Sequence, residues 1–113
     1  MKITQYEQAG IVVLEAKGEL VGGQETDELK TSIDKIIQSG NQKLVIDLGK
    51  VQYINSIALG LLTATHVNYS KRGGRVILCQ VEKQIQNIFI ITKLSMIFEL
   101  FTDQKEALAS FAK

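Results

Sequence analysis

The chain has 113 residues, 45% of them hydrophobic and 22% charged, and thirteen lysines and arginines against twelve acidic residues give a net charge of +1. This length corresponds to one domain, and the hydrophobic content excludes a disordered protein. The charges are spread along the chain, so they favour neither nucleic acid nor an anionic membrane as a partner.

The single cysteine, Cys79, cannot form an internal disulfide, and Met1-Lys2-Ile3 does not open a secretory signal segment. No apolar run approaches the ~20 residues that a membrane-spanning helix needs. The chain contains no proline and no linker-like segment. We therefore expect one cytoplasmic domain over residues 1–113, without a membrane span.

The first part of the chain predicts a β-hairpin followed by an amphipathic helix. Two runs rich in β-branched residues, 3–6 and 11–16, flank a glycine-containing turn at residues 8–10. A helix is expected to begin at residues 26–28 and to end at Gly40. Its apolar residues recur at helical spacing: Leu29, Ile33, Ile36 and Ile37.

The middle of the chain predicts a βαβ unit. Residues 43–48 form a compact apolar run, typical of a strand that is covered on both faces. A helix is expected from about Ser56 to the Gly73-Gly74 pair, and residues 75–79 are the next strand. Such a unit crosses over right-handed and makes its two strands parallel.

The last part repeats this alternation, with a helix over residues 82–91 and an apolar strand over residues 96–101. Asp103 and Glu106 have the spacing of a capping box before a short terminal helix. The fold class is therefore α/β: a sandwich with a mixed sheet, an N-terminal hairpin and then mostly parallel strands, covered by about four helices.

No catalytic or metal-binding constellation is predicted. Ser56 and the only histidine, His66, share one predicted helix and lie about 15 Å apart along its axis, too far for a nucleophile and its base. One cysteine and one histidine cannot form a zinc site, and the glycines match no phosphate-binding motif. We interpret Cys79 as part of the core and expect no cofactor.

Asn55 and Ser56 stand between the central strand and the following apolar helix. Both residue types are good N-caps, and the simplest interpretation is that one side chain accepts a free amide hydrogen bond at the helix start. On spacing alone, nothing further follows.

The segment around these two residues resembles the signature of the STAS, or anti-sigma-factor-antagonist, family. The family's pattern is apolar-x-acidic-Ser-x-small-Leu-Gly before a helix, as in the anti-anti-sigma proteins of Gram-positive bacteria, and here Asn55 stands at its acidic position and Ser56 at its serine. The similarity extends over nearly the whole chain and includes Gly18-Glu19-Leu20, residues 43–48, Gly73-Gly74, and Ile88-Phe89 with Leu94.

The resemblance implies a regulator that is not an enzyme and that has Ser56 as its phosphorylation site. Such a protein binds an anti-sigma-factor serine kinase with a histidine-kinase-like ATPase fold when unphosphorylated, and a metal-dependent serine phosphatase is its second implied partner. The residues expected to bind the partner are Gly18, Glu19, Leu20, Val21, Asn55, Ser56, Ile57, Ala58, Leu59 and Gly60.

The chain departs from the family pattern where Asn55 and Val21 replace acidic residues and Ala58 replaces a glycine. These departures motivate a second hypothesis: a STAS scaffold or accessory subunit of a stress-signalling assembly or lipid transporter that does not cycle through phosphate. A third class, a small-molecule or nucleotide-binding module, is supported only by the α/β architecture.

Overall fold

The computed structural model describes residues 3–111, so the opening Met1-Lys2 lies outside it. Its centre is a five-stranded sheet whose strands lie side by side in chain order. The first two strands form an antiparallel hairpin, and the second, third, fourth and fifth run parallel to one another. The strands are β1 (Ile3–Gln8), β2 (Ile11–Leu20), β3 (Lys43–Ile54), β4 (Arg75–Cys79) and β5 (Glu99–Phe101).

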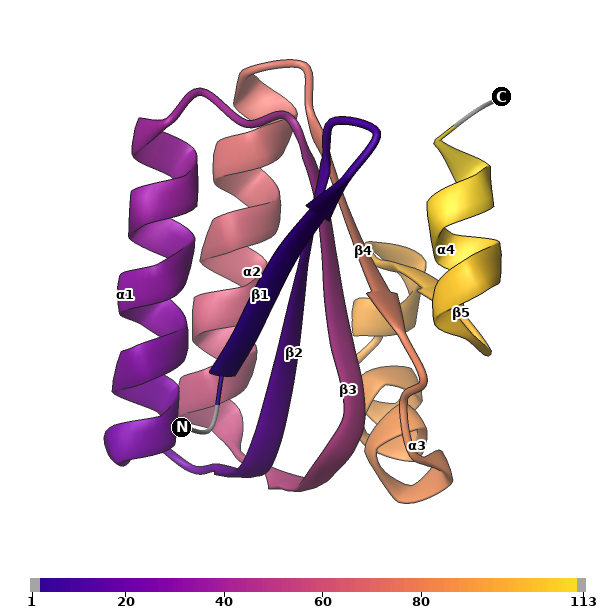
Figure 1. Cartoon of the computed structure of the whole chain (residues 1–113). Coiled ribbons are helices and arrows are strands. Elements are labelled where there is room, and N and C mark those ends of the chain that lie inside the picture. The colour runs from indigo at the N-terminus through magenta and orange to yellow at the C-terminus, as the bar shows by residue number, and fades with distance from the viewer. Residues whose placement is uncertain (1–2, 112–113) are drawn as a thin grey trace.

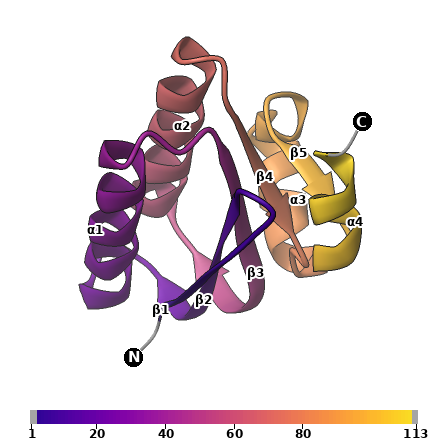
Figure 2. The same ribbon diagram turned by 45° about the horizontal axis from the view of Figure 1, so that its top comes forward.

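Helices cover both faces of this sheet (Figures 1 and 2). On one face lie α1 (Gln24–Gln38) and α2 (Ser56–Lys71), and on the other lies the short α4 (Gln104–Ser110). Between β4 and β5 the chain forms α3 (Lys83–Ile91) and the 3-10 helix η1 (Leu94–Met96). The predicted α/β sandwich with a mixed sheet and four α-helices is confirmed.

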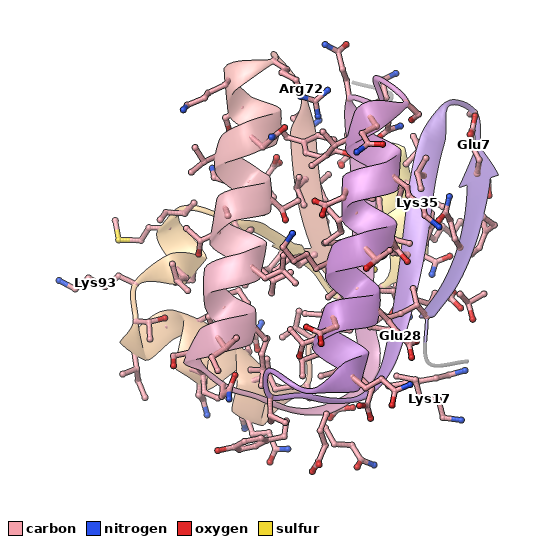
Figure 3. The ribbon with its side chains drawn as sticks, turned by 90° about the vertical axis from the view of Figure 1, so that its left-hand side faces the viewer. Glu7, Lys17, Glu28, Lys35, Arg72 and Lys93 are labelled. Atoms are coloured by element: carbon pink, nitrogen blue, oxygen red, sulfur yellow. The ribbon has the colours of Figure 1, made fainter. Side chains whose placement is uncertain are left out.

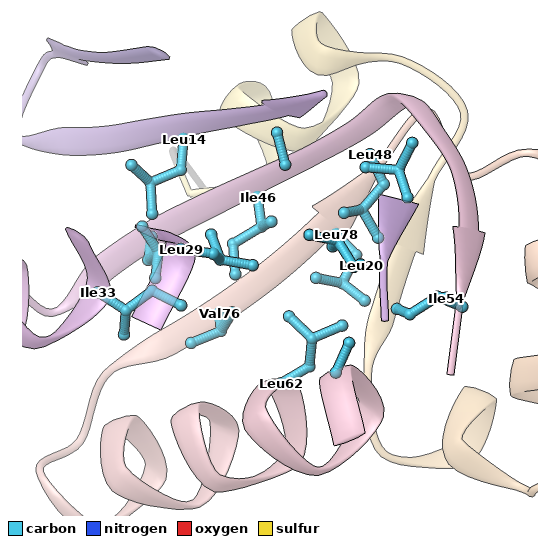
Figure 4. Packing of buried hydrophobic residues seen from close by; sticks show 14 of the residues in the cluster. Leu14, Leu20, Leu29, Ile33, Ile46, Leu48, Ile54, Leu62, Val76 and Leu78 are labelled. Carbon is cyan, nitrogen blue, oxygen red and sulfur yellow. The ribbon is translucent and has the colours of Figure 1, made fainter. Parts of the chain in front are cut away.

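The larger core lies between the sheet and the first three helices (Figure 4). Fully buried side chains of β2, β3 and β4 meet those of α1 and α2, and each contributes roughly 1.5–3 kcal/mol through burial. Examples are Leu14, Ile46, Leu78, Leu29 and Leu62. A smaller core on the opposite face packs Val13, Val45 and Ile77 against Ala107 of α4.

Two predicted boundaries are corrected by this packing. The central strand continues to Ile54 rather than ending at residue 48, because β2 remains paired with it up to Leu20. The first helix begins at Gln24 and not at residues 26–28. Thr26 is buried inside the first turn, where its Oγ1 accepts a hydrogen bond from the Gly22 amide at 3.0 Å.

The predicted last strand over residues 96–101 is also wrong in its first half. Lys93 adopts a left-handed conformation, and the chain then forms η1 before β5 begins at Glu99. The predicted cap is confirmed, because Asp103 Oδ1 accepts from the Glu106 amide at 2.7 Å. Within residues 3–111, no helix combines the length and hydropathy needed to cross a bilayer.

Candidate functional site

The loops that follow β2 and β3 lie together at one end of the sheet. The two strands are parallel, and their register continues to the pair Leu20 and Ile54, beyond the point where β4 stops pairing with β3. Carboxyl ends of parallel strands share one edge of a sheet, where α/β proteins commonly place binding residues. The loop leading into α1 and the first turn of α2 therefore lie beside each other.

Asn55 joins these two loops and caps α2. Its Oδ1 accepts from the amides of Ile57 at 3.1 Å and Ala58 at 3.3 Å, and its Nδ2 donates to the Val21 carbonyl at 2.9 Å. Its own amide donates to the Leu20 carbonyl at 3.1 Å. The predicted N-cap is confirmed at Asn55, and an aspartate could not make the donation to Val21.

Ser56 is the first residue of α2, and its side chain is exposed. The first turn of the helix contains no acidic residue, so its positive dipole end is not neutralised by a neighbouring carboxylate of that turn. The hydroxyl is thus accessible to another protein and lies where the helix favours added negative charge.

Three exposed side chains with large apolar surfaces lie near Ser56: one in the loop after β2, one at the end of β3 and one in the first turn of α2. Val21, Tyr53 and Ile57 have exposed fractions of 36%, 53% and 61%. The Ile57 side chain lies over Gly22, whose φ is +88° and whose position would bring a Cβ within 2.8 Å of Ile57 Cδ1. We call Val21, Tyr53, Ser56 and Ile57 the Ser56 surface, and an open groove of about 300 Å³ between α1 and α2 adjoins it.

The residues predicted to bind a partner divide by burial. The side chains of Leu20, Ala58 and Leu59 are buried, so they support the Ser56 surface from beneath and do not face a partner. The exposed members of the predicted set are Glu19, Val21, Ser56, Ile57 and Gly60. Sequence reasoning missed Tyr53, which pairs in register with Glu19.

Comparison with known families identifies the family and the fold. A family model described as the STAS domain matches residues 2–107. The chain belongs to the STAS domain family. This assignment confirms the family expected from residues 54–60 and from the ordered similarity along the chain.

Similar proteins cover nearly the whole STAS chain at low identity. It is 23% identical to BtrV of Bordetella bronchiseptica, whose name describes a candidate anti-sigma factor antagonist, over 98% of this chain and 95% of that one. An anti-sigma-factor antagonist (STAS) domain protein of Planctomyces limnophilus superposes with a TM-score of 0.88, 19% identity and 98% of each chain covered. SpoIIAA of Bacillus, solved in its phosphorylated form, gives a TM-score of 0.76 and 17% identity, covering 96% of this chain and 98% of that one.

His66 and Cys79 take structural positions in this STAS domain. His66 lies on the same helix as Ser56, and its ring packs against Phe98 at a centroid distance of 5.3 Å. Cys79 is fully buried, and burial, followed by the charge of Asp47, raises the pKa of its thiol to about 12. A thiol with so high a pKa is a poor nucleophile, as expected for a core cysteine.

A second polar cluster, on the other face of the sheet, fastens α4. The buried Asp47 carboxylate accepts from the Gly49 amide at 2.8 Å, Gln80 Nε2 at 2.5 Å and Gln104 Nε2 at 2.7 Å. Gln104 Nε2 also donates to Glu15 at 2.9 Å. Because these bonds tie Gln104 of α4 to the sheet, we assign this cluster a structural role. Residues 3–111 contain no group of three or more histidine, cysteine or acidic side chains placed to hold a metal.

Proposed function

We propose that this protein is a non-catalytic anti-sigma factor antagonist of the cytoplasm. In its unphosphorylated form it binds an anti-sigma-factor serine kinase through the Ser56 surface, and phosphorylation of Ser56 releases it. A metal-dependent serine phosphatase restores the binding form. The observation that carries the proposal is the exposed Ser56 hydroxyl among exposed apolar side chains at the start of α2.

The expected effect of phosphate follows from its charge. Phosphorylation would add about −1.5 to −2 charges at the helix N-terminus, where the dipole stabilises negative charge, so the domain stays folded. A partner that packs on Val21, Tyr53 and Ile57 would have to desolvate this dianion. A loss of about 3 kcal/mol of binding free energy lowers the affinity more than a hundredfold.

Asn55 is compatible with this switch although it replaces the family's acidic residue. Its neutral carboxamide caps α2 and holds the Val21 loop against it, so the shape of the surface is fixed without a carboxylate. A neutral cap also leaves one charge fewer to repel the phosphate on Ser56.

Phosphate mapping tests the proposal directly. The protein is incubated with ATP and a histidine-kinase-like anti-sigma factor from its source organism, and phosphopeptides are identified by mass spectrometry. We expect phosphate on Ser56, none on Ser56→Ala, and normal incorporation in the control Ser70→Ala, which removes an exposed hydroxyl near the other end of α2. Absence of incorporation, or equal incorporation into Ser56→Ala, would refute the switch.

The second candidate function is a STAS scaffold or transporter accessory that is never phosphorylated. It is favoured by the replacement of acidic residues by Asn55 and Val21, which makes the rim of the surface less acidic. A pull-down with tagged protein distinguishes the two. Recovery of a transporter ATPase or a large homotypic assembly, without a kinase-like protein, would support this alternative.

A further inference from the structure

The two faces of the sheet are covered by helices of very different length. One face carries α1 and α2, of 15 and 16 residues, which stand side by side over it (Figure 3, with Glu28 and Lys35 on α1 and Arg72 at the end of α2). Helix α4, on the other face, has only seven residues. Isolated helices shorter than about 12–15 residues are marginal in water, so α4 is helical only while it is packed on the sheet.

The apolar contacts of α4 are small. Its buried side chain is that of Ala107, while Leu108 and Phe111 are only partly buried. An open groove of about 600 Å³ lies between α4 and the β1–β2 hairpin, with Ile11, Leu108 and Phe111 among its lining residues. Water therefore reaches one side of the helix, and because burial energy grows with the apolar area covered, packing alone holds α4 weakly.

Gln104, at the start of α4, supplies the polar anchor. Its Nε2 donates to Glu15 at 2.9 Å and to Asp47 at 2.7 Å, and its Oε1 accepts from the Tyr6 hydroxyl. Glu15 and Asp47 are partners in the β2–β3 register, and like charges placed side by side disfavour each other. Within residues 3–111 neither carboxylate forms an ion pair with a lysine or arginine. Departure of α4 would return water to both carboxylates, which lowers the free-energy cost of opening.

The single cysteine of the chain lies beneath α4. Cys79 is fully buried in the smaller core, together with Val13, Val45, Ile77 and Ala107. Burial, followed by the charge of Asp47, raises the pKa of the Cys79 thiol to about 12, so the thiol is a poor nucleophile while α4 is docked. Opening of α4 would expose this thiol and leave the larger core on the other face intact.

We propose that α4 is a detachable cover, which opens as one unit while the rest of the domain stays folded and thereby exposes an apolar strip of the sheet. The strip consists of Val13, Val45, Ile77 and Cys79. Segments with few buried apolar contacts open at the lowest free energies in the native state. The inference does not depend on the proposed function, because α4 and the helix that begins at Ser56 lie on opposite faces of the sheet (Figure 1).

Thiol labelling of the intact protein with dithionitrobenzoate tests the cover, since Cys79 is the only thiol. The reagent is kept dilute, so that the labelling rate follows the population of the open form. At low urea the rate should change little with urea, because opening of α4 exposes a small surface, and it should rise steeply only near global unfolding. A steep dependence at all urea concentrations, parallel to global unfolding, or no labelling below the unfolding transition, would overturn the inference.

Two variants locate the opening. Gln104→Ala removes the shared donor and should raise the labelling rate in the absence of urea about 30-fold. The control Asn55→Ala removes the cap of α2 and lowers global stability, but it should label at the wild-type rate in the absence of urea. Equal acceleration in the two variants would assign the labelling to global unfolding. A wild-type rate in Gln104→Ala would show that α4 does not control access to Cys79, and either result would overturn the inference.

Discussion

The removal of the Asn55 side chain tests how the Ser56 surface is held together. In Asn55→Ala, the amides of Ile57 and Ala58 lose their acceptor, and the Val21 carbonyl loses its donor. The variant leaves Ser56 in place. It therefore separates the architecture of the surface from the chemistry of its hydroxyl.

The expected cost is the sum of two ordinary contributions. Loss of an N-cap costs about 1 kcal/mol, and loss of one partly exposed hydrogen bond costs about another 1 kcal/mol. The free energy of unfolding should thus fall by about 2 kcal/mol in Asn55→Ala. For a domain of this size, the melting temperature should fall by about 8 °C.

Asn55→Asp is the matched variant. It keeps the two accepted hydrogen bonds and adds a negative charge at the helix N-terminus, worth about 0.3–1 kcal/mol, but it loses the donation to Val21. The free energy of unfolding of Asn55→Asp should therefore fall by no more than about 0.5 kcal/mol. Urea denaturation followed by circular dichroism measures both variants, and equal losses in the two would refute the assignment of the cap as a main contribution.

Three further predictions concern the frame of the site. Gly22→Ala should lower the free energy of unfolding by about 1–2 kcal/mol, because the φ of Gly22 is +88°. The control Gly60→Ala, on the exposed side of α2, should raise it by about 0.5–1 kcal/mol. An unchanged melting temperature in Gly22→Ala would contradict this. Burial raises the pKa of both Cys79 and Tyr69 to about 12. The folded protein then holds protons that the unfolded chain releases from about pH 9 upward, so the free energy of unfolding falls between pH 9 and 12. In Cys79→Ala this fall should begin near pH 10. The same dependence on pH in Cys79→Ala and the wild type would contradict the raised pKa of Cys79. In urea denaturation, Gln104→Ala should lower the free energy of unfolding by about 2 kcal/mol, because the carboxylates of Asp47 and Glu15 lose a hydrogen-bond donor. A decrease below about 0.5 kcal/mol would show that these hydrogen bonds do not hold α4 on the sheet.

The elements that could be predicted from sequence are those with local signals. Helix α2 has a capping residue at its start and the Gly73-Gly74 pair after its end, and β4 is a continuous apolar run. The extension of β3 to Ile54 has no such signal, because Gln52 and Tyr53 are exposed and the strand exists there only through pairing with β2. The hydrophobic periodicity of one segment does not show with which distant segment it pairs.

The strand predicted over residues 96–101 was wrong in its first half because the prediction relied on apolar composition alone. Apolar residues are expected in the core, yet Met96 and Ile97 are exposed, and only residues 99–101 pair with β4. A composition-based prediction cannot distinguish a buried strand from an exposed apolar segment.

The candidate site could be predicted in part. Asn55 and Ser56 were identified by their place at a helix start, but the bond from Asn55 to Val21 joins residues 34 positions apart. Tyr53 was missed because the strand was expected to end before it, so no alternation placed its side chain outward. The buried positions of Leu20, Ala58 and Leu59 follow from the packing of the larger core, which a motif does not encode.

The most direct test of the central claim is the affinity of the anti-sigma factor for the protein with and without phosphate on Ser56. Both forms are titrated by calorimetry at one ionic strength, after circular dichroism has confirmed that they fold alike. We predict that phosphorylation weakens binding more than a hundredfold. Equal affinities of the two forms would contradict the account, because the Ser56 hydroxyl would then lie outside the contact.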